Sequence, residues 1–195
     1  MIRSKFVLVI AVASTCALVA AAFTPIAQDM GMPQPTDEHK HMLAGAGEWE
    51  GTLTSYAIPG VKPEPVAARE AVTAIGGFWV LSDFHCTFMG QPYHGSGHYG
   101  YDAEKKKYIG TWVDSMSSQL ALMEGELDAK TKTLVMRWQA PDMMSGKIVP
   151  QRSECVENGD SRTTTFFSGE GAGTKSMVIE MKRKGSKATE AGAKK

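Results

Sequence analysis

The stretch FWVLSDFHCTFMGQPYHGSGHYGY, residues 78–101, decides the fold. It holds two runs in which side chains of different character alternate, separated by a short break around Met89 and Gly90. A period of two residues is typical of β-strands. Because a short link makes successive strands neighbours in space, the stretch predicts an antiparallel pair, with strands over 78–88 and 93–101.

The same pattern extends in both directions from this pair. Runs of about six to ten residues rich in Thr, Val, Tyr, Phe and Trp are separated by turn residues such as Asn158 and Gly159. Ten strands are predicted, over 48–57, 66–75, 78–88, 93–101, 107–114, 119–127, 133–139, 148–157, 162–168 and 175–184. Closing the sheet removes the exposed edges that an open sheet would leave. We therefore expect a mainly β fold, an antiparallel β-barrel of about ten strands, with a two-sheet sandwich as the alternative.

One helix precedes the strands. Thr36 is a favourable N-cap, Asp37 and Glu38 lie in the first turn, and Gly45 follows the last residue of the pattern, so a short helix is predicted over 37–44. The barrel domain is then 36–184. Residues 23–35, which carry several Pro and Gly, are expected to form a flexible leader, and the Gly-, Ala- and Lys-rich tail 185–195 is expected to be disordered.

The first 22 residues have the pattern of a secretory signal. Arg3 and Lys5 precede an almost purely apolar run over 6–23, which contains the small residues of 20–22. The prediction is a signal peptide over 1–22 and a periplasmic or extracellular protein. An uncleaved signal would instead anchor the chain in a membrane, and that is the only membrane partner the sequence suggests.

Charge and cysteine content limit the classes of function. The chain carries 21 Lys and Arg against 21 Asp and Glu, a formal net charge of +0, so it has no basic surplus with which to bind nucleic acid. In an oxidising compartment Cys86 and Cys155 can form one disulfide if the fold brings them together. Two buried, unpaired thiols are the alternative, and the sequence slightly favours it.

Five short segments resemble the family known as domain of unknown function 1579. They are GEWEG (47–51), GGFW (76–79), GYD (100–102), KKKY (105–108) and GTWVDSMS (110–117), within a resemblance over about 39–182. The resemblance implies a lipocalin-like barrel with an interior cavity and gives no established activity. The Gly-x-Trp opening also resembles the first strand of lipocalins. That resemblance implies structural roles for Gly47 and for Trp49, which would close one barrel end under a basic residue of the last strand, Arg183 or Lys182.

Three neighbouring strands supply the candidate binding residues. If their registers agree, alternation gathers His85, His94, His98, Asp83 and Asp114 on one face with two tryptophans, while Ser115 follows in a loop at the barrel mouth. Aromatic and methionine side chains would then line an apolar pocket or simply fill the core. The predicted ligand-binding residues are Trp49, Trp79, His85, His98, Trp112, Asp114 and Ser115.

These residues predict binding without catalysis. We expect a small apolar or amphipathic molecule in the cavity, with no catalytic residue assigned. A hydrolase or isomerase using His85 or His98 with Asp114 is an alternative, as are a haem-binding barrel and a structural interaction module of the cell envelope. We expect no metal and no other cofactor, because His94 and His98 lie some 13 Å apart along one strand and His85 falls on a different strand.

Overall fold

The structure is a computed structural model that describes residues 31–185. The predicted signal peptide, most of the leader and residues 186–195 of the tail lie outside the described residues. From Gln34 onward the described chain forms one compact unit. No helix within residues 31–185 combines the length and the hydropathy needed to span a membrane.

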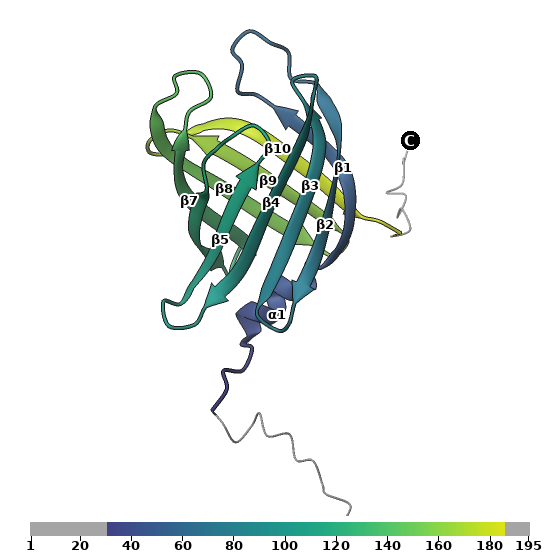
Figure 1. The fold of residues 1–195 in the computed structure, drawn as a ribbon, viewed down its shortest axis with the longest axis vertical. Helices are drawn as coiled ribbons and strands as arrows, with labels where there is room; N and C mark the ends of the chain where they lie inside the picture. The colour runs from purple at the N-terminus through teal and green to yellow at the C-terminus, as the bar shows by residue number, and fades with distance from the viewer. Residues whose placement is uncertain (1–30, 186–195) are drawn as a thin grey trace, which may run out of the picture. The chain divides into compact units, whose positions relative to one another are not determined.

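One helix and ten strands make up this unit (Figure 1). Their bounds are α1 (Asp37–Ala44), β1 (Gly47–Ser55), β2 (Pro65–Ile75), β3 (Trp79–Phe88), β4 (Gln91–Asp102), β5 (Lys107–Asp114), β6 (Ala121–Asp128), β7 (Thr133–Pro141), β8 (Ile148–Asn158), β9 (Ser161–Ser168) and β10 (Thr174–Arg183). Each strand pairs antiparallel with the next, and β10 pairs with β1. The predicted ten-strand closed barrel is therefore confirmed, and the sandwich alternative is wrong.

The predicted bounds differ from the observed ones by at most two residues. Strand β6 begins at Ala121 rather than at residue 119. The reason is local, because the Gln119 amide donates to Ser117 Oγ at 3.1 Å and so keeps the chain in its loop. Phe78 lies in the turn before β3, where its ring packs edge-on against the His39 ring of α1 at 5.1 Å between centroids.

Glycines in β4 make room for aromatic rings on both faces of the sheet. A Cβ at Gly95 or Gly97 would lie 2.2 or 2.7 Å from the ring of Trp112, which occupies the barrel interior. On the outer face, a Cβ at Gly100 would lie 2.6 Å from the ring of Trp79. Each ring lies flat against a bare backbone, so the small residues of β4 fix where the neighbouring aromatic side chains can go.

Helix α1 covers one end of the barrel, the lower end in Figure 1. Beneath it Trp49 is 1% exposed, and its Nε1 donates to the carbonyl oxygen of Gly45 at 3.0 Å. Arg183, directly opposite Trp49 in the β1–β10 register, places its Cζ 4.4 Å from the centre of the indole ring. Its Nη1 and Nη2 donate to the carbonyls of Ala46 and Ala44 at 2.6 and 3.0 Å.

Arg183 therefore supplies the basic residue that the sequence left undecided between Arg183 and Lys182. One guanidinium binds carbonyl oxygens at the end of α1, covers Trp49 and contacts Asp160 of the β8–β9 turn at 3.4 Å. Cations are favourable at a helix C-terminus and over an indole face. The first strand, the last strand and the helix are thus joined through a single side chain.

Replacing Gly47 with Ala tests this arrangement. Gly47 has a φ of +139°, and a Cβ there would lie 2.6 Å from Arg183 Nη1. We expect Gly47→Ala to lower the free energy of unfolding by about 3 kcal/mol, measured by urea denaturation. The matched control is Gly60→Ala, where φ is +76° and no atom lies within 4 Å, so about 1 kcal/mol is expected. Equal losses would show that Arg183 does not require glycine at position 47.

Candidate functional site: the barrel cavity

The barrel encloses a cavity of about 670 Å³. At the closed end it is lined by His41, Met42 and Gly45, from α1 and the residue that follows it. At the opposite end it reaches the loops between strands, where Met116 and Met143 line it and are themselves about half exposed. The cavity therefore runs along the barrel from the helix to an entrance among the loops.

Aromatic and aliphatic side chains form most of the cavity wall. The alternation of β3 turns Val80 and Phe84 inward, and both are buried. Strands across the barrel contribute further apolar groups. The wall includes Leu53, Val80, Phe84, Phe88, Trp112, Met123, Met136, Trp138, Phe166, Met177 and Ile179. Methionine side chains adapt to irregular apolar shapes, and aromatic rings supply large apolar surfaces.

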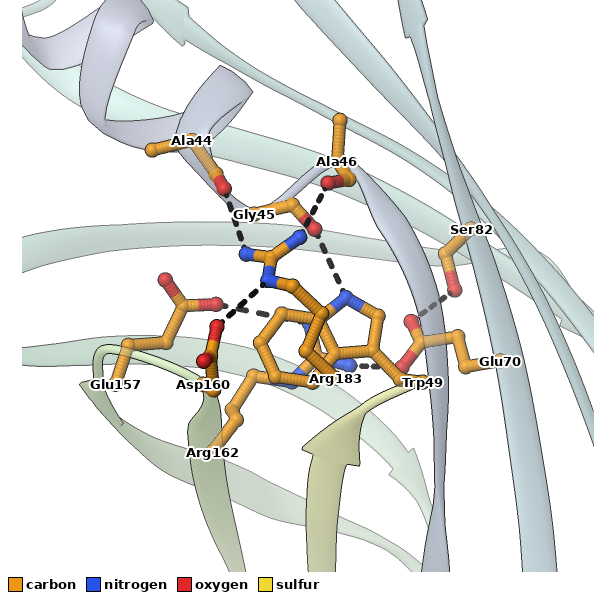
Figure 2. A network of polar contacts seen from close by, with 10 residues as sticks. All are labelled: Ala44, Gly45, Ala46, Trp49, Glu70, Ser82, Glu157, Asp160, Arg162 and Arg183. Atoms are coloured by element: carbon orange, nitrogen blue, oxygen red, sulfur yellow. Dashed lines mark hydrogen bonds and ion pairs between the residues drawn. The ribbon is translucent and has the colours of Figure 1, made fainter. Parts of the chain in front are cut away.

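Charged side chains line the cavity toward its closed end, next to Trp49 and Arg183 (Figure 2). Arg162 of β9 pairs through Nη2 with Glu70 of β2, and its Nη1 lies 3.8 Å from Glu157. Ser82 Oγ donates to Glu70 Oε1 at 2.6 Å. The Cζ atom of Arg162 also lies 4.5 Å from the centre of the Trp49 ring. We call Glu70, Ser82, Glu157 and Arg162 the interior charge cluster.

The cluster connects the barrel's interior to its closed end. The side chains of Glu70 and Arg162 are each 14% exposed, so each charge depends on its partner for compensation. Two carboxylates of the cluster face one guanidinium, and Lys132 of the β6–β7 turn also lines this end of the cavity. A ligand group placed there would meet hydrogen-bond acceptors that already have a partner.

Two tyrosines add neutral polar groups to the wall. The Trp112 Nε1 donates to the hydroxyl oxygen of Tyr93 at 3.2 Å. Burial raises the pKa of Tyr93 and of Tyr99 far above the ordinary value of a phenol. Both hydroxyls therefore stay protonated at physiological pH and serve as hydrogen-bonding groups without charge.

Cys86 and Cys155 both line the cavity as free thiols, so in this structure they do not form the disulfide that the sequence allowed. Burial raises the pKa of each thiol above its ordinary value. A thiol held in its neutral form is a weak nucleophile. Both cysteines contribute apolar surface to the wall.

The structure divides the predicted binding residues among four places. Trp112 and Asp114 line the cavity, whereas Trp49 lies in the sealed end beneath it. Asp114 also holds its own loop, because its Oδ1 accepts from the Met116 amide at 2.8 Å. Ser115 lies at the end of β5, where its Oγ accepts from the His94 amide at 3.1 Å.

Trp79, His85 and His98 lie on the outer face of the barrel, so the expectation that all these side chains share one surface is wrong. In β3 the inward face carries Val80, Ser82 and Phe84, and His85 alternates with them. The apolar face turns inward because burying it removes the greater apolar area from water. The cavity lining was instead predicted to be the face that carries the polar residues of β3. Consequently neither His85 nor His98 faces the cavity with Asp114, the arrangement that the hydrolase or isomerase alternative needed.

The histidines form a different constellation. His85 and His94 are direct cross-strand partners on β3 and β4, with parallel rings 4.3 Å apart. Asp83 Oδ1 lies 2.5 Å from His94 Nε2, and its Oδ2 lies 3.2 Å from His85 Nε2. The contact with His94 is the main cause that lowers the pKa of Asp83 below its ordinary value. We call these three residues the outer His–Asp cluster.

Sequence reasoning gathered Asp83, His85 and His94 on one face on condition that the registers agree, but it did not establish the register that makes His85 and His94 direct partners. The signal that was missed is the two-residue turn at Met89 and Gly90. A turn of this length fixes the β3–β4 register, in which Trp79 pairs with Gly100 and His85 pairs with His94. The interior charge cluster was missed as well. Its members lie on four different strands, and only the closed barrel brings them together.

The comparisons with known proteins agree with this architecture. The family model described as "Protein of unknown function (DUF1579)" matches residues 34–184. The chain belongs to this family. It is also similar to the crystal structure of Rv2717c from M. tuberculosis, with a TM-score of 0.59 and 9% sequence identity, over 77% of this chain and 99% of that chain. At this identity the likeness concerns the fold alone. None of the curated proteins matches the chain.

Removing one member of the interior charge cluster tests how strongly the charges depend on one another. Arg162→Met leaves the buried carboxyl group of Glu70 without its cationic partner, and we expect a loss of about 3 kcal/mol in the free energy of unfolding. The double variant Glu70→Gln/Arg162→Met should recover most of this loss. Lys107→Met, which breaks the exposed pair with Glu124 on the outer face, is the control and should have a far smaller effect. Additive effects of the two interior substitutions would contradict the coupling.

Proposed function

We propose that the protein binds one small apolar or amphipathic molecule in the barrel cavity without transforming it. The observation that carries the proposal is the cavity itself, a continuous space of about 670 Å³ with predominantly aromatic and aliphatic walls. Sites for small molecules commonly measure about 300–1,000 Å³ and combine apolar walls with a few polar groups. Burial of apolar ligand surface supplies affinity at about 25 cal/mol per Å².

Charges along the wall favour particular polar groups on the ligand. Four carboxylates line the cavity, those of Glu70, Asp114, Asp142 and Glu157, against the two cationic side chains of Lys132 and Arg162. An anionic headgroup would therefore be repelled, while a neutral or cationic one would be tolerated. The proposed ligand is an amphipath whose polar end is uncharged or positive.

The loop end provides the route of entry. Large apolar side chains are exposed on the loops and strand ends that surround it, which favours the approach of an apolar molecule. They are Tyr56, Val61, Met89, Met116, Leu120, Met143, Met144 and Ile148. The signal pattern in residues 1–22 supports an exported protein, so we place this binding in the periplasm or outside the cell.

A substitution that fills the cavity tests the proposal. Thr164 of β9 lines the cavity, whereas its neighbour Thr163 is exposed on the outer face. In the mature wild-type chain, titration with the neutral fluorescent probe N-phenyl-1-naphthylamine should give a saturable rise in emission. Thr164→Trp should lower the affinity for the probe at least tenfold, and Thr163→Trp should leave it unchanged. Circular dichroism would establish that both variants are folded.

Competition then tests the charge preference. Dodecylamine and dodecanol, below their aggregation limits, should displace the probe at lower concentrations than dodecanoate does. A chain that binds no probe, or a Thr164→Trp variant that binds it as well as wild type, would contradict the proposed function. Stronger displacement by dodecanoate would contradict the charge preference alone.

A further inference from the structure

The outer His–Asp cluster is separate from the cavity. Asp83 and His85 lie two residues apart on β3 and share its outer face, and His94 stands opposite His85 on β4. Their side chains are 45%, 29% and 55% exposed. A ligand can therefore reach the cluster from solvent, and nothing that fills the cavity needs to touch it.

We propose that Asp83, His85 and His94 form a binding site for a divalent late first-row transition-metal ion such as Zn²⁺ or Cu²⁺. One ligand atom from each of the three side chains lies within 4.8 Å of the others. Both imidazoles present Nε2 to the carboxylate, at 3.2 Å for His85 and 2.5 Å for His94. Two imidazole nitrogens and one carboxylate oxygen already converge on one point of the surface.

The spacing suits coordination after small side-chain rotations. Ligands about 2.1 Å from a tetrahedral Zn²⁺ are separated from one another by roughly 3.4 Å. A metal ion would lie between the imidazoles and the carboxylate, held by the two Nε2 atoms and one carboxylate oxygen of Asp83. Imidazole nitrogen suits Zn²⁺, Cu²⁺ and Ni²⁺, whereas Mg²⁺ and Ca²⁺ prefer sites made of oxygen alone.

The backbone beneath the cluster is fixed on both strands. The register from Trp79↔Gly100 to Phe88↔Gln91 runs without a bulge through all three residues. Ser115 adds a second attachment at His94, because its Oγ accepts from the His94 amide at 3.1 Å and its own amide donates to the His94 carbonyl at 2.8 Å. The two imidazoles are therefore presented by paired strands and not by a loop, which keeps the entropic cost of assembling the site low.

Nearby charges act in opposite directions on the affinity of the site for a cation. The Asp83 carboxylate attracts a metal ion, whereas Arg69 of β2, the exposed register partner of His85, opposes its binding. Three protein ligands leave at least one coordination position to water in a tetrahedral complex. These features describe an accessible site with open positions, in contrast to the closed four-ligand sites that serve only structure.

Isothermal titration of the untagged mature chain with ZnCl₂ and with CuCl₂ tests the proposal. We expect one ion per chain at this site, with Cu²⁺ bound more tightly than Zn²⁺ as the Irving–Williams order requires. His94→Ala and Asp83→Asn should each weaken Zn²⁺ binding at least tenfold. The electron paramagnetic resonance spectrum of the Cu²⁺ complex should show coupling to imidazole nitrogen, and His85→Ala should reduce that coupling.

The matched control is His98→Ala. His98 lies four residues beyond His94 on the same outer face of β4 and is exposed, but it is not part of the cluster. This variant should bind both ions as wild type does, and circular dichroism should show that all variants keep the β fold. No detectable Zn²⁺ or Cu²⁺ binding, or a loss in His98→Ala equal to that in His94→Ala, would overturn the proposal. Neither result would bear on ligand binding in the cavity.

Discussion

The contact between Arg183 and Trp49 is the constraint on which the rest of the structure depends. A barrel of ten strands must join its first strand to its last, and here the two partners in that closing register also seal one end of the barrel. Arg183 binds carbonyl oxygens where α1 ends, and the Trp49 indole donates to Gly45 just beyond it. Strand closure and helix docking therefore depend on the same two side chains, and Gly47 supplies the space that they require.

The sealed end explains how charge is tolerated inside the barrel. Arg162 packs against the same indole ring as Arg183 and pairs with Glu70. The interior charge cluster therefore contacts the Trp49 ring that closes this end of the barrel. Above it the wall becomes aromatic and aliphatic up to the loops. The cavity therefore runs from compensated charges along an apolar wall to an open mouth. The outer His–Asp cluster belongs to the opposite face of the sheet and is chemically independent of the cavity.

Local patterns in the sequence predict the elements well, because strand, turn and cap signals act over a few residues. Helix α1 and strand β5 have their predicted bounds, and Arg183 covers Trp49 as the family resemblance implies. The assignment of faces failed, because alternation alone does not say which face is inside. His85 and His98 were predicted to face the cavity because they are polar. Burial of the apolar side chains Val80 and Phe84 turns the other face of β3 inward. Glu70 and Arg162 were not predicted because their contact depends on strands far apart in the sequence.

Hydrogen exchange of the indole N–H groups, followed by nuclear magnetic resonance, tests the central claim most directly. If Arg183 and Gly45 hold Trp49 in the sealed end, its Nε1 proton should exchange as slowly as the most protected backbone amides, while that of the partly exposed Trp79 exchanges quickly. Arg183→Met should speed the exchange at Trp49 without affecting Trp79. Rapid exchange at Trp49 in the wild-type chain, or a rate unchanged by Arg183→Met, would contradict the account.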